Sequence, residues 1–126
     1  DSANHTLICG NAGHNPAYLV RRGQVQEIAP EGMALGLVPA AQFFVEERVV
    51  ELLPGDLIAL YTDGVTEAMN SAHQEYGEER FKDALASAQT KPLAQALQYL
   101  IDSVRAFVGD APPHDDITLV LLRRKA

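Results

Sequence analysis

Cysteine is almost absent from this sequence, and tryptophan is missing altogether. The only cysteine among the 126 residues is Cys9, so a disulfide within the chain and a metal site of paired cysteines are both excluded. Cys9 lies in the apolar run 7–9, where a buried structural thiol is the expected role and a nucleophile is the alternative. A chain without internal disulfides suits a reducing compartment, so we expect a cytoplasmic protein.

Positive charge and long hydrophobic runs are scarce as well. The sequence has 10 Lys and Arg residues against 17 Asp and Glu residues, which gives a net charge of -7. A surface for nucleic acid or an anionic membrane needs a basic patch, so neither partner is expected. The longest mostly apolar stretch, residues 33–45, contains Gly36 and Pro39 and is shorter than the roughly 20 residues that span a bilayer. The acidic excess does suit a site that concentrates cations.

Several catalytic motifs are missing too. The sequence has no glycine-rich phosphate loop and no Gly-x-Ser-x-Gly nucleophile elbow. With 47% hydrophobic and 21% charged residues, it has the composition of at most one globular domain. Its first residue is Asp1, and an apolar segment follows almost at once without the basic and hydrophobic regions of a signal peptide. We therefore expect the chain to begin inside a larger domain.

The residue pattern predicts an α+β fold that is rich in strands first and in helices later. Residues 44–52 alternate between apolar and charged side chains, which is typical of a half-exposed strand. Residues 77–89 place Phe81 and Leu85 on one helical face. Residues 92–108 have the same periodicity and predict a second amphipathic helix. The predicted strands are residues 5–10, 18–21, 24–28, 44–52, 57–62 and 117–122.

The first acidic cluster follows the predicted strand 57–62. Asp63 stands where that strand ends, and Gly64 comes next. A glycine at this position lets the backbone turn sharply and brings a carbonyl or a water molecule close to a metal ion. Asp-Gly pairs are also common in plain turns, but a hairpin turn would lead into another strand, whereas residues 65–69 are typical of a short helix or an irregular segment. The pattern therefore favours a functional role for Asp63.

The second acidic cluster is the pair Asp115 and Asp116, which opens the predicted strand 117–122. Acids at the end of one strand and at the start of another can gather hard oxygen ligands around a divalent cation. An exposed loop pair, or an Asp116 that caps the strand entry, explains these residues equally well. A further segment, residues 11–16, contains His14 among Gly, Asn and Pro residues, for which a turn is the default interpretation.

Six segments resemble, in order and spacing, the carboxy-terminal half of a bacterial SpoIIE-type phosphatase domain. This is a branch of the PPM family of metal-dependent protein serine/threonine phosphatases. The segments are residues 11–16, 32–37, 54–56, 61–68, 75–80 and 113–119. The resemblance implies part of an α/β/β/α sandwich, in which two antiparallel β-sheets are flanked by helices and a metal site lies at one edge. It also implies that residues 1–126 are the carboxy-terminal portion of a single domain, whose amino-terminal half, with a first Gly-Asp metal motif, lies outside this chain.

The same resemblance implies which residues form the site. Asp63 and Asp115 would be catalytic metal ligands, with Asp116 supporting the turn or, alternatively, exchanging roles with Asp115. Gly64 follows the first ligand as part of the metal motif. A nearby loop would contribute residues that shape the site, namely Asn11, Gly13, His14 and Asn15. The implied cofactors are two Mn²⁺ or Mg²⁺ ions.

The activity that the resemblance implies is hydrolysis of phosphoserine or phosphothreonine on a regulatory protein, typically an anti-sigma-factor antagonist of the STAS fold. Two divalent ions would activate a water molecule for direct attack, so that no covalent phosphoenzyme is needed. A sensor or receiver domain often precedes a phosphatase domain of this kind. Because the upstream ligands lie outside the chain, we expect the isolated 126 residues to be inactive.

Two other functions compete with this one. Haloacid-dehalogenase-type phosphatases use an Asp-x-Asp motif, but the nucleophile position two residues before Asp63 is Tyr61, which cannot form the required acyl phosphate. A truncated or degenerate phosphatase fold that binds a partner protein without turnover is compatible with the sequence. A Gly-Asp motif in the upstream coding region would discriminate against that second alternative.

Overall fold

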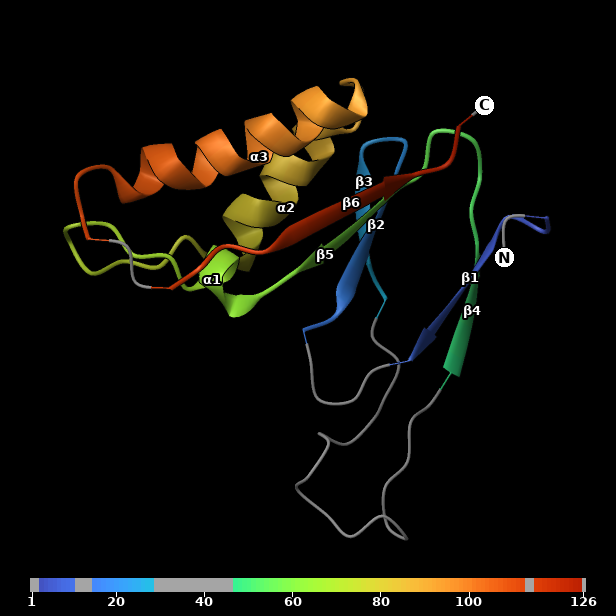
Figure 1. Ribbon diagram of the computed structural model, residues 1–126, viewed down its shortest axis with the longest axis horizontal. Coiled ribbons are helices and arrows are strands. Elements are labelled where there is room, and N and C mark those ends of the chain that lie inside the picture. The colour runs from blue at the N-terminus through green and yellow to red at the C-terminus, as the bar shows by residue number, and fades with distance from the viewer. Residues whose placement is uncertain (1–2, 11–14, 29–46, 113–114, 126) are drawn as a thin grey trace, which may run out of the picture.

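A computed structural model describes residues 3–10, 15–28, 47–112 and 115–125 (Figure 1). The strands are β1 (Thr6–Gly10), β2 (Ala17–Arg21), β3 (Gln24–Ile28), β4 (Glu47–Glu51), β5 (Leu57–Tyr61) and β6 (Leu119–Arg123), and the helices are α1 (Asp63–Thr66), α2 (Gly77–Ala88) and α3 (Leu93–Val108). The predicted strands and the two predicted long helices are confirmed, with ends that differ by one or two residues, and the start of the predicted strand 44–52 lies outside the described residues. No helix in these ranges is long and apolar enough to cross a membrane.

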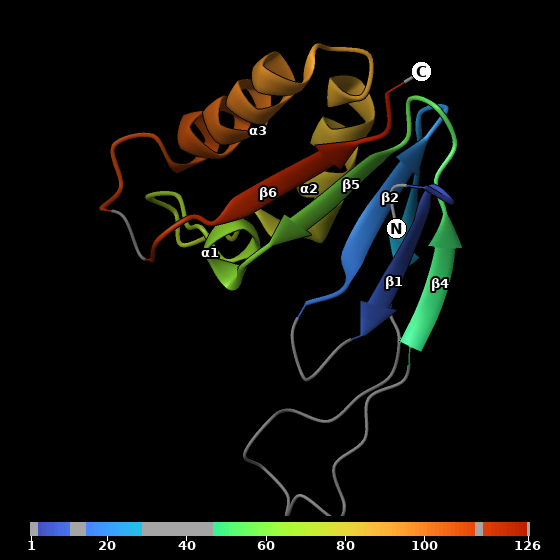
Figure 2. The ribbon, with the colours of Figure 1, turned by 45° about the vertical axis from the view of Figure 1, so that its right-hand side comes forward.

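The strands form two antiparallel sheets (Figures 1 and 2). The larger sheet has the order β3-β2-β5-β6, and the smaller one consists of β1 and β4. Helices α2 and α3 lie over one face of the larger sheet (Figure 1). On its other face, Leu19 and Ile58 pack against Leu7 and Val50 of the smaller sheet. The predicted α+β fold, two antiparallel sheets flanked by helices, is confirmed.

The side chains of β5 explain this layered arrangement. Leu57 and Ala59 are fully buried in the core that α2 and α3 share with the larger sheet, whereas Ile58 is buried on the opposite face. Successive side chains of a strand point to opposite faces, so an apolar strand of this kind needs cover on both sides. The helices contribute Leu85 and Leu100 to the same core, and burial of each such side chain stabilises the fold by about 1.5–3 kcal/mol.

An ion pair between the partly exposed Arg21 and the buried Asp56 closes the turn that leads into β5. Asp56 is only 2% exposed, and its carboxylate accepts hydrogen bonds from Arg21 Nη2 at 2.6 Å and from the Leu53 N–H at 2.7 Å. Burial by itself would raise the pKa of Asp56. The hydrogen bonds from Arg21 and Leu53, together with the charges of Arg21 and Arg124, outweigh this effect and bring the pKa below its ordinary value. The ion pair therefore holds the end of β2 against the start of β5.

We expect the variant Arg21→Met of the complete domain to be less stable than the wild type, because it leaves the buried Asp56 carboxylate without its ion-pair partner. Arg22→Met is the matched control, since Arg22 is adjacent and exposed, and it should change the stability by less than about 0.5 kcal/mol. Urea denaturation measures both values. Equal stability of the two variants at neutral pH would contradict the role of the pair.

The stability difference between the wild type and Arg21→Met should depend on pH. Because the pKa of Asp56 is depressed in the folded state, its contribution is fully present above the unfolded-state pKa, about 3.9. The contribution is lost as the pH falls through the lower folded-state pKa. The difference should therefore be constant near neutrality and should shrink at strongly acidic pH.

Candidate functional site

The pairing of β5 with β6 brings the two acidic clusters of the sequence to one edge of the larger sheet. The two strands are antiparallel, and the last residue of β5, Tyr61, lies opposite the first residue of β6, Leu119. The pairing continues beyond the strands, because the Thr62 N–H donates to the Thr118 carbonyl at 3.1 Å and the Thr118 N–H donates to Thr62 Oγ1 at 3.3 Å. Asp63, which follows Thr62, therefore lies at the same edge as the acid pair that precedes Thr118.

Asp63 is exposed and is the first residue of the one-turn helix α1. The preceding residue, Thr62, is extended, and the Asp63 carbonyl accepts a hydrogen bond from the Glu67 N–H at 2.8 Å. The chain therefore passes directly from the strand into a helical turn. A plain hairpin turn at this position is excluded, and the expected short helical segment is confirmed, although it begins at Asp63 rather than at Val65.

Gly64 allows α1 to approach the backbone of the second acidic segment. A Cβ atom on Gly64 would lie 2.0 Å from the Asp116 carbonyl oxygen and 2.8 Å from the Asp116 carbonyl carbon. The φ angle of Gly64 does not lie in the left-handed region, in contrast to that of Gly55 or Gly77. A left-handed backbone conformation is therefore not the reason for a glycine at this position. What requires glycine here is the close approach of two backbone segments.

One residue of the predicted site loop reaches Asp63. The side-chain amide of Asn15 donates a hydrogen bond from Nδ2 to Asp63 Oδ1 at 2.7 Å. This hydrogen bond orients the carboxylate and leaves its second oxygen free of partners within the described residues. The other three predicted loop residues, Asn11, Gly13 and His14, lie outside the described part of the chain.

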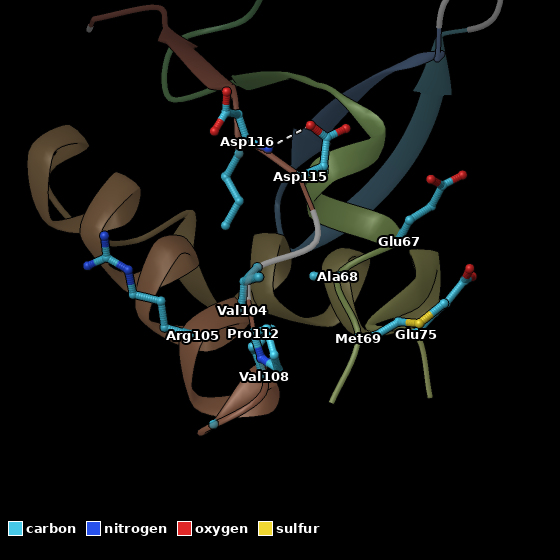
Figure 3. A pocket seen from close by; sticks show the side chains of 13 residues that line it. Glu67, Ala68, Met69, Glu75, Val104, Arg105, Val108, Pro112, Asp115 and Asp116 are labelled. Atoms are coloured by element: carbon cyan, nitrogen blue, oxygen red, sulfur yellow. Dashed lines mark hydrogen bonds between the residues drawn. The ribbon is translucent and has the colours of Figure 1, made fainter. Parts of the chain in front are cut away.

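The two acids before β6 differ in their contacts. Asp115 Oδ1 accepts a hydrogen bond from the Asp116 N–H at 2.7 Å, and both side chains are exposed (Figure 3). The Asp115 side chain therefore supports the local turn, a role that we expected for Asp116. The second carboxylate oxygen of Asp115 and both carboxylate oxygens of Asp116 have no hydrogen-bond donor among the described residues.

The three acids are of the right chemical type for a hard divalent cation, but they form only part of a coordination shell. Carboxylate oxygens are the ligands that Mg²⁺ and Mn²⁺ prefer. Within the described residues, no three His, Cys, Asp or Glu side chains come close enough together to hold a metal ion. Asp63, Asp115 and Asp116 thus fit the cation by donor type and by their common edge, and a complete site needs ligands from elsewhere.

Tyr61 is partly buried and packs against the core. Its ring stacks on Tyr18 with centroids 5.4 Å apart, its edge meets Phe81, and its hydroxyl donates to the Tyr18 hydroxyl at 3.3 Å. Burial raises the pKa of Tyr61, so the phenol stays protonated near neutral pH. The residue at the position of a dehalogenase-type nucleophile therefore packs under the helices and takes no part in the acidic edge.

A cavity of about 700 Å³ opens beside the acid pair (Figure 3). Asp115 and Asp116 line one side of it, and the segment after α1 and the last turns of α3 supply the rest. Among the lining residues that sequence analysis did not single out are Met69, Glu75, Arg105 and Val108. No local pattern distinguishes Arg105 from any other exposed residue of an amphipathic helix.

Comparisons with known proteins agree with this architecture. The family model described as Stage II sporulation protein E (SpoIIE) matches residues 1–125. The protein IcfG of Synechocystis is 30% identical over 98% of this chain and 19% of its own length. The phosphoserine phosphatase RsbU of Bacillus subtilis is 28% identical over 96% of this chain and 36% of its own length.

A solved structure has the same arrangement of sheets and helices. The SiaA-PP2C domain of Pseudomonas aeruginosa superposes with a TM-score of 0.82 at 26% identity, covering 98% of this chain and 48% of the solved chain. The present chain thus spans less than half the length of each of these three proteins. The family match extends over nearly every residue, and the chain belongs to the SpoIIE family, with the fold of the PPM-type phosphatases.

Proposed function

We propose that this chain is the carboxy-terminal portion of a metal-dependent protein phosphatase domain that hydrolyses phosphoserine or phosphothreonine on a regulatory protein. The observation that carries this proposal is the meeting of Asp63, Gly64 and the Asp115–Asp116 pair at one sheet edge. The similarity to RsbU, a phosphoserine phosphatase, supports the same reaction class. The reaction is a hydrolysis, in which water replaces the protein hydroxyl on phosphorus.

In this proposal Asp63 and Asp115 are the catalytic metal ligands, with Asp116 able to exchange roles with Asp115. Two Mn²⁺ or Mg²⁺ ions, when bound, would activate water and stabilise the charge on the phosphoryl oxygens. The remaining ligands would come from the amino-terminal half of the domain, outside these 126 residues. Within the chain, Asn15 orients the Asp63 carboxylate, and Gly64 keeps α1 against the Asp116 backbone.

The class of protein phosphatase proposed here suggests both a protein substrate and a second domain in the same polypeptide. We propose a phosphorylated STAS-domain protein, such as an anti-sigma-factor antagonist, as the substrate, and a sensor or receiver domain upstream in the same polypeptide. The single cysteine and the acidic net charge support a cytoplasmic protein that binds neither nucleic acid nor membranes.

A second function is a phosphatase-fold module that binds a partner protein without turnover. It is favoured by one observation, that the described residues contain no cluster of three metal-ligating side chains. The two functions differ in whether the complete domain contains the missing ligands, so they are separated by an assay on that domain.

We expect the complete domain to release phosphate from a phosphoserine-containing STAS-domain protein when Mn²⁺ is present. Removal of the metal with EDTA should reduce turnover to background, and added Mn²⁺ should restore it. The 126-residue chain assayed alone is the control, and it should be inactive because its metal shell is incomplete. Stable binding of the STAS-domain protein without turnover at any metal concentration would support the non-catalytic module instead.

A further inference from the structure

The cavity beside Asp115 and Asp116 has walls that are built from segments far apart in the sequence. One wall is the segment after α1, with Glu67, Met69 and Glu75. The opposite wall is α3, with Arg105 and Val108 (Figure 3). A volume of about 700 Å³ is in the range of pockets that bind small-molecule ligands.

Hydrogen bonds within the chain connect the walls of the cavity to one another. The Tyr76 N–H donates to the Ala68 carbonyl at 2.7 Å, which closes the segment after α1 on itself. The Tyr76 hydroxyl is hydrogen-bonded to Ser103 Oγ at 2.6 Å and so ties this segment to α3. The Arg80 guanidinium donates to the Tyr76 carbonyl at 2.9 Å and lies 4.5 Å above the Phe107 ring. The cavity is therefore a preformed feature of the fold.

The floor of the cavity is apolar. Ala68 and Val104 line it and are 8% and 2% exposed. Met69 and Val108, both partly buried, extend this apolar surface. A floor of this kind gains free energy when it covers an apolar side chain, at roughly 25 cal/mol for each Å² removed from water.

Positive and negative side chains lie on opposite sides of the cavity rim. Among the described residues that line the cavity, Arg105 is the one basic residue, and its guanidinium has no hydrogen-bond or ion-pair partner in the same part of the chain. Figure 3 shows Arg105 on one side of the cavity and Glu67 and Glu75 on the other. A ligand that crosses the cavity thus meets a positive charge on the side of α3 and negative charges on the side of the segment after α1.

We propose that this cavity binds the segment of the protein substrate next to the phosphorylated residue, with an apolar side chain on the Ala68–Val104 floor and an acidic side chain paired with Arg105. This inference rests on the proposed phosphatase function. Asp115 and Asp116 line the same cavity, so a polypeptide whose phosphate lies at the acidic edge has its neighbouring residues at the cavity mouth. Arg105 is then a specificity-determining residue that reads the sequence around the phosphoserine.

The test compares matched phosphoserine peptides with the complete, Mn²⁺-loaded domain. Each peptide carries a leucine and either a glutamate or a lysine, placed in turn at each position near the phosphoserine. At the position that faces Arg105, wild-type kcat/KM should favour the glutamate peptide by about fivefold or more. Arg105→Glu should reverse this preference, and Arg105→Gln should bring the ratio close to one.

The ratio of the kcat/KM values for the two peptides makes the test specific, since a variant that is merely less well folded lowers both kcat/KM values together. Arg22→Glu, an equal charge change in the exposed β2–β3 turn, should keep the wild-type ratio. An active wild type without preference at any position, or an unchanged ratio in both Arg105 variants, would overturn the inference and leave the proposed function standing. A wild-type domain that hydrolyses the phosphorylated STAS-domain protein but none of the peptides would overturn the inference alone, and one that hydrolyses neither would remove both.

Discussion

Replacing Asp63 by asparagine in the complete domain is expected to lower kcat/KM by more than about a hundredfold while the domain stays folded. Even the outer partners of metal ligands are worth about 10- to 100-fold in metal affinity or activity, and the loss of a direct carboxylate ligand should cost more. Asp63 is exposed, and its asparagine replacement can still accept the hydrogen bond from Asn15, so the fold should be little affected. Phosphate release at saturating Mn²⁺ and thermal unfolding measure the two effects.

The matched control for this variant is Asp110→Asn, which removes the same charge from an exposed turn after α3 and should leave activity unchanged. Among the acids before β6, Asp115→Asn should be more damaging than Asp116→Asn. Wild-type turnover by a well-folded Asp63→Asn domain would exclude Asp63 as a ligand. Equal tolerance of the changes at Asp115 and Asp116 would show that the segment before β6 carries no ligand.

The variant Gly64→Ala should lower activity as much as Asp63→Asn does, for a different reason. Its methyl group would lie 2.0 Å from the Asp116 carbonyl oxygen, and a backbone atom cannot move aside by changing a rotamer. Relief of this overlap requires α1 to move away from the segment before β6, which separates Asp63 from Asp115 and Asp116. We expect activity close to background, and a loss of about 1–3 kcal/mol of unfolding free energy from the overpacking.

Gly77→Ala separates the geometric effect from a general loss of stability. Gly77 has a φ of 82° and open space around its Cβ position, so alanine there should cost about 1–2 kcal/mol through backbone strain alone. This control should lose stability to a similar extent and keep its phosphatase activity. A Gly64→Ala domain with normal activity and normal stability would mean that α1 does not lie against Asp116 as described.

Much of the fold could be predicted from local pattern. The alternation of residues 44–52 and the apolar run 57–62 predicted β4 and β5, and the helical periodicity around Phe81 and Leu85 predicted α2. These predictions succeed because the periods of strand and helix are properties of the backbone itself. The ends of the elements were less accurate, since they depend on hydrogen bonds such as those between Thr62 and Thr118, which join residues far apart in the chain.

The sequence by itself determined the chemical type of the candidate site. It placed acids at the end of one strand and at the start of another, and the carboxylates of both clusters are hard oxygen ligands. The tertiary structure decided that the clusters meet, because β5 pairs with β6 from Tyr61 opposite Leu119. It also decided that Gly64 serves close approach and that the Asp115 side chain holds the turn. The cavity next to Arg105 arises only when α3 packs beside the segment after α1, and such packing between distant segments leaves no periodic signal in the sequence.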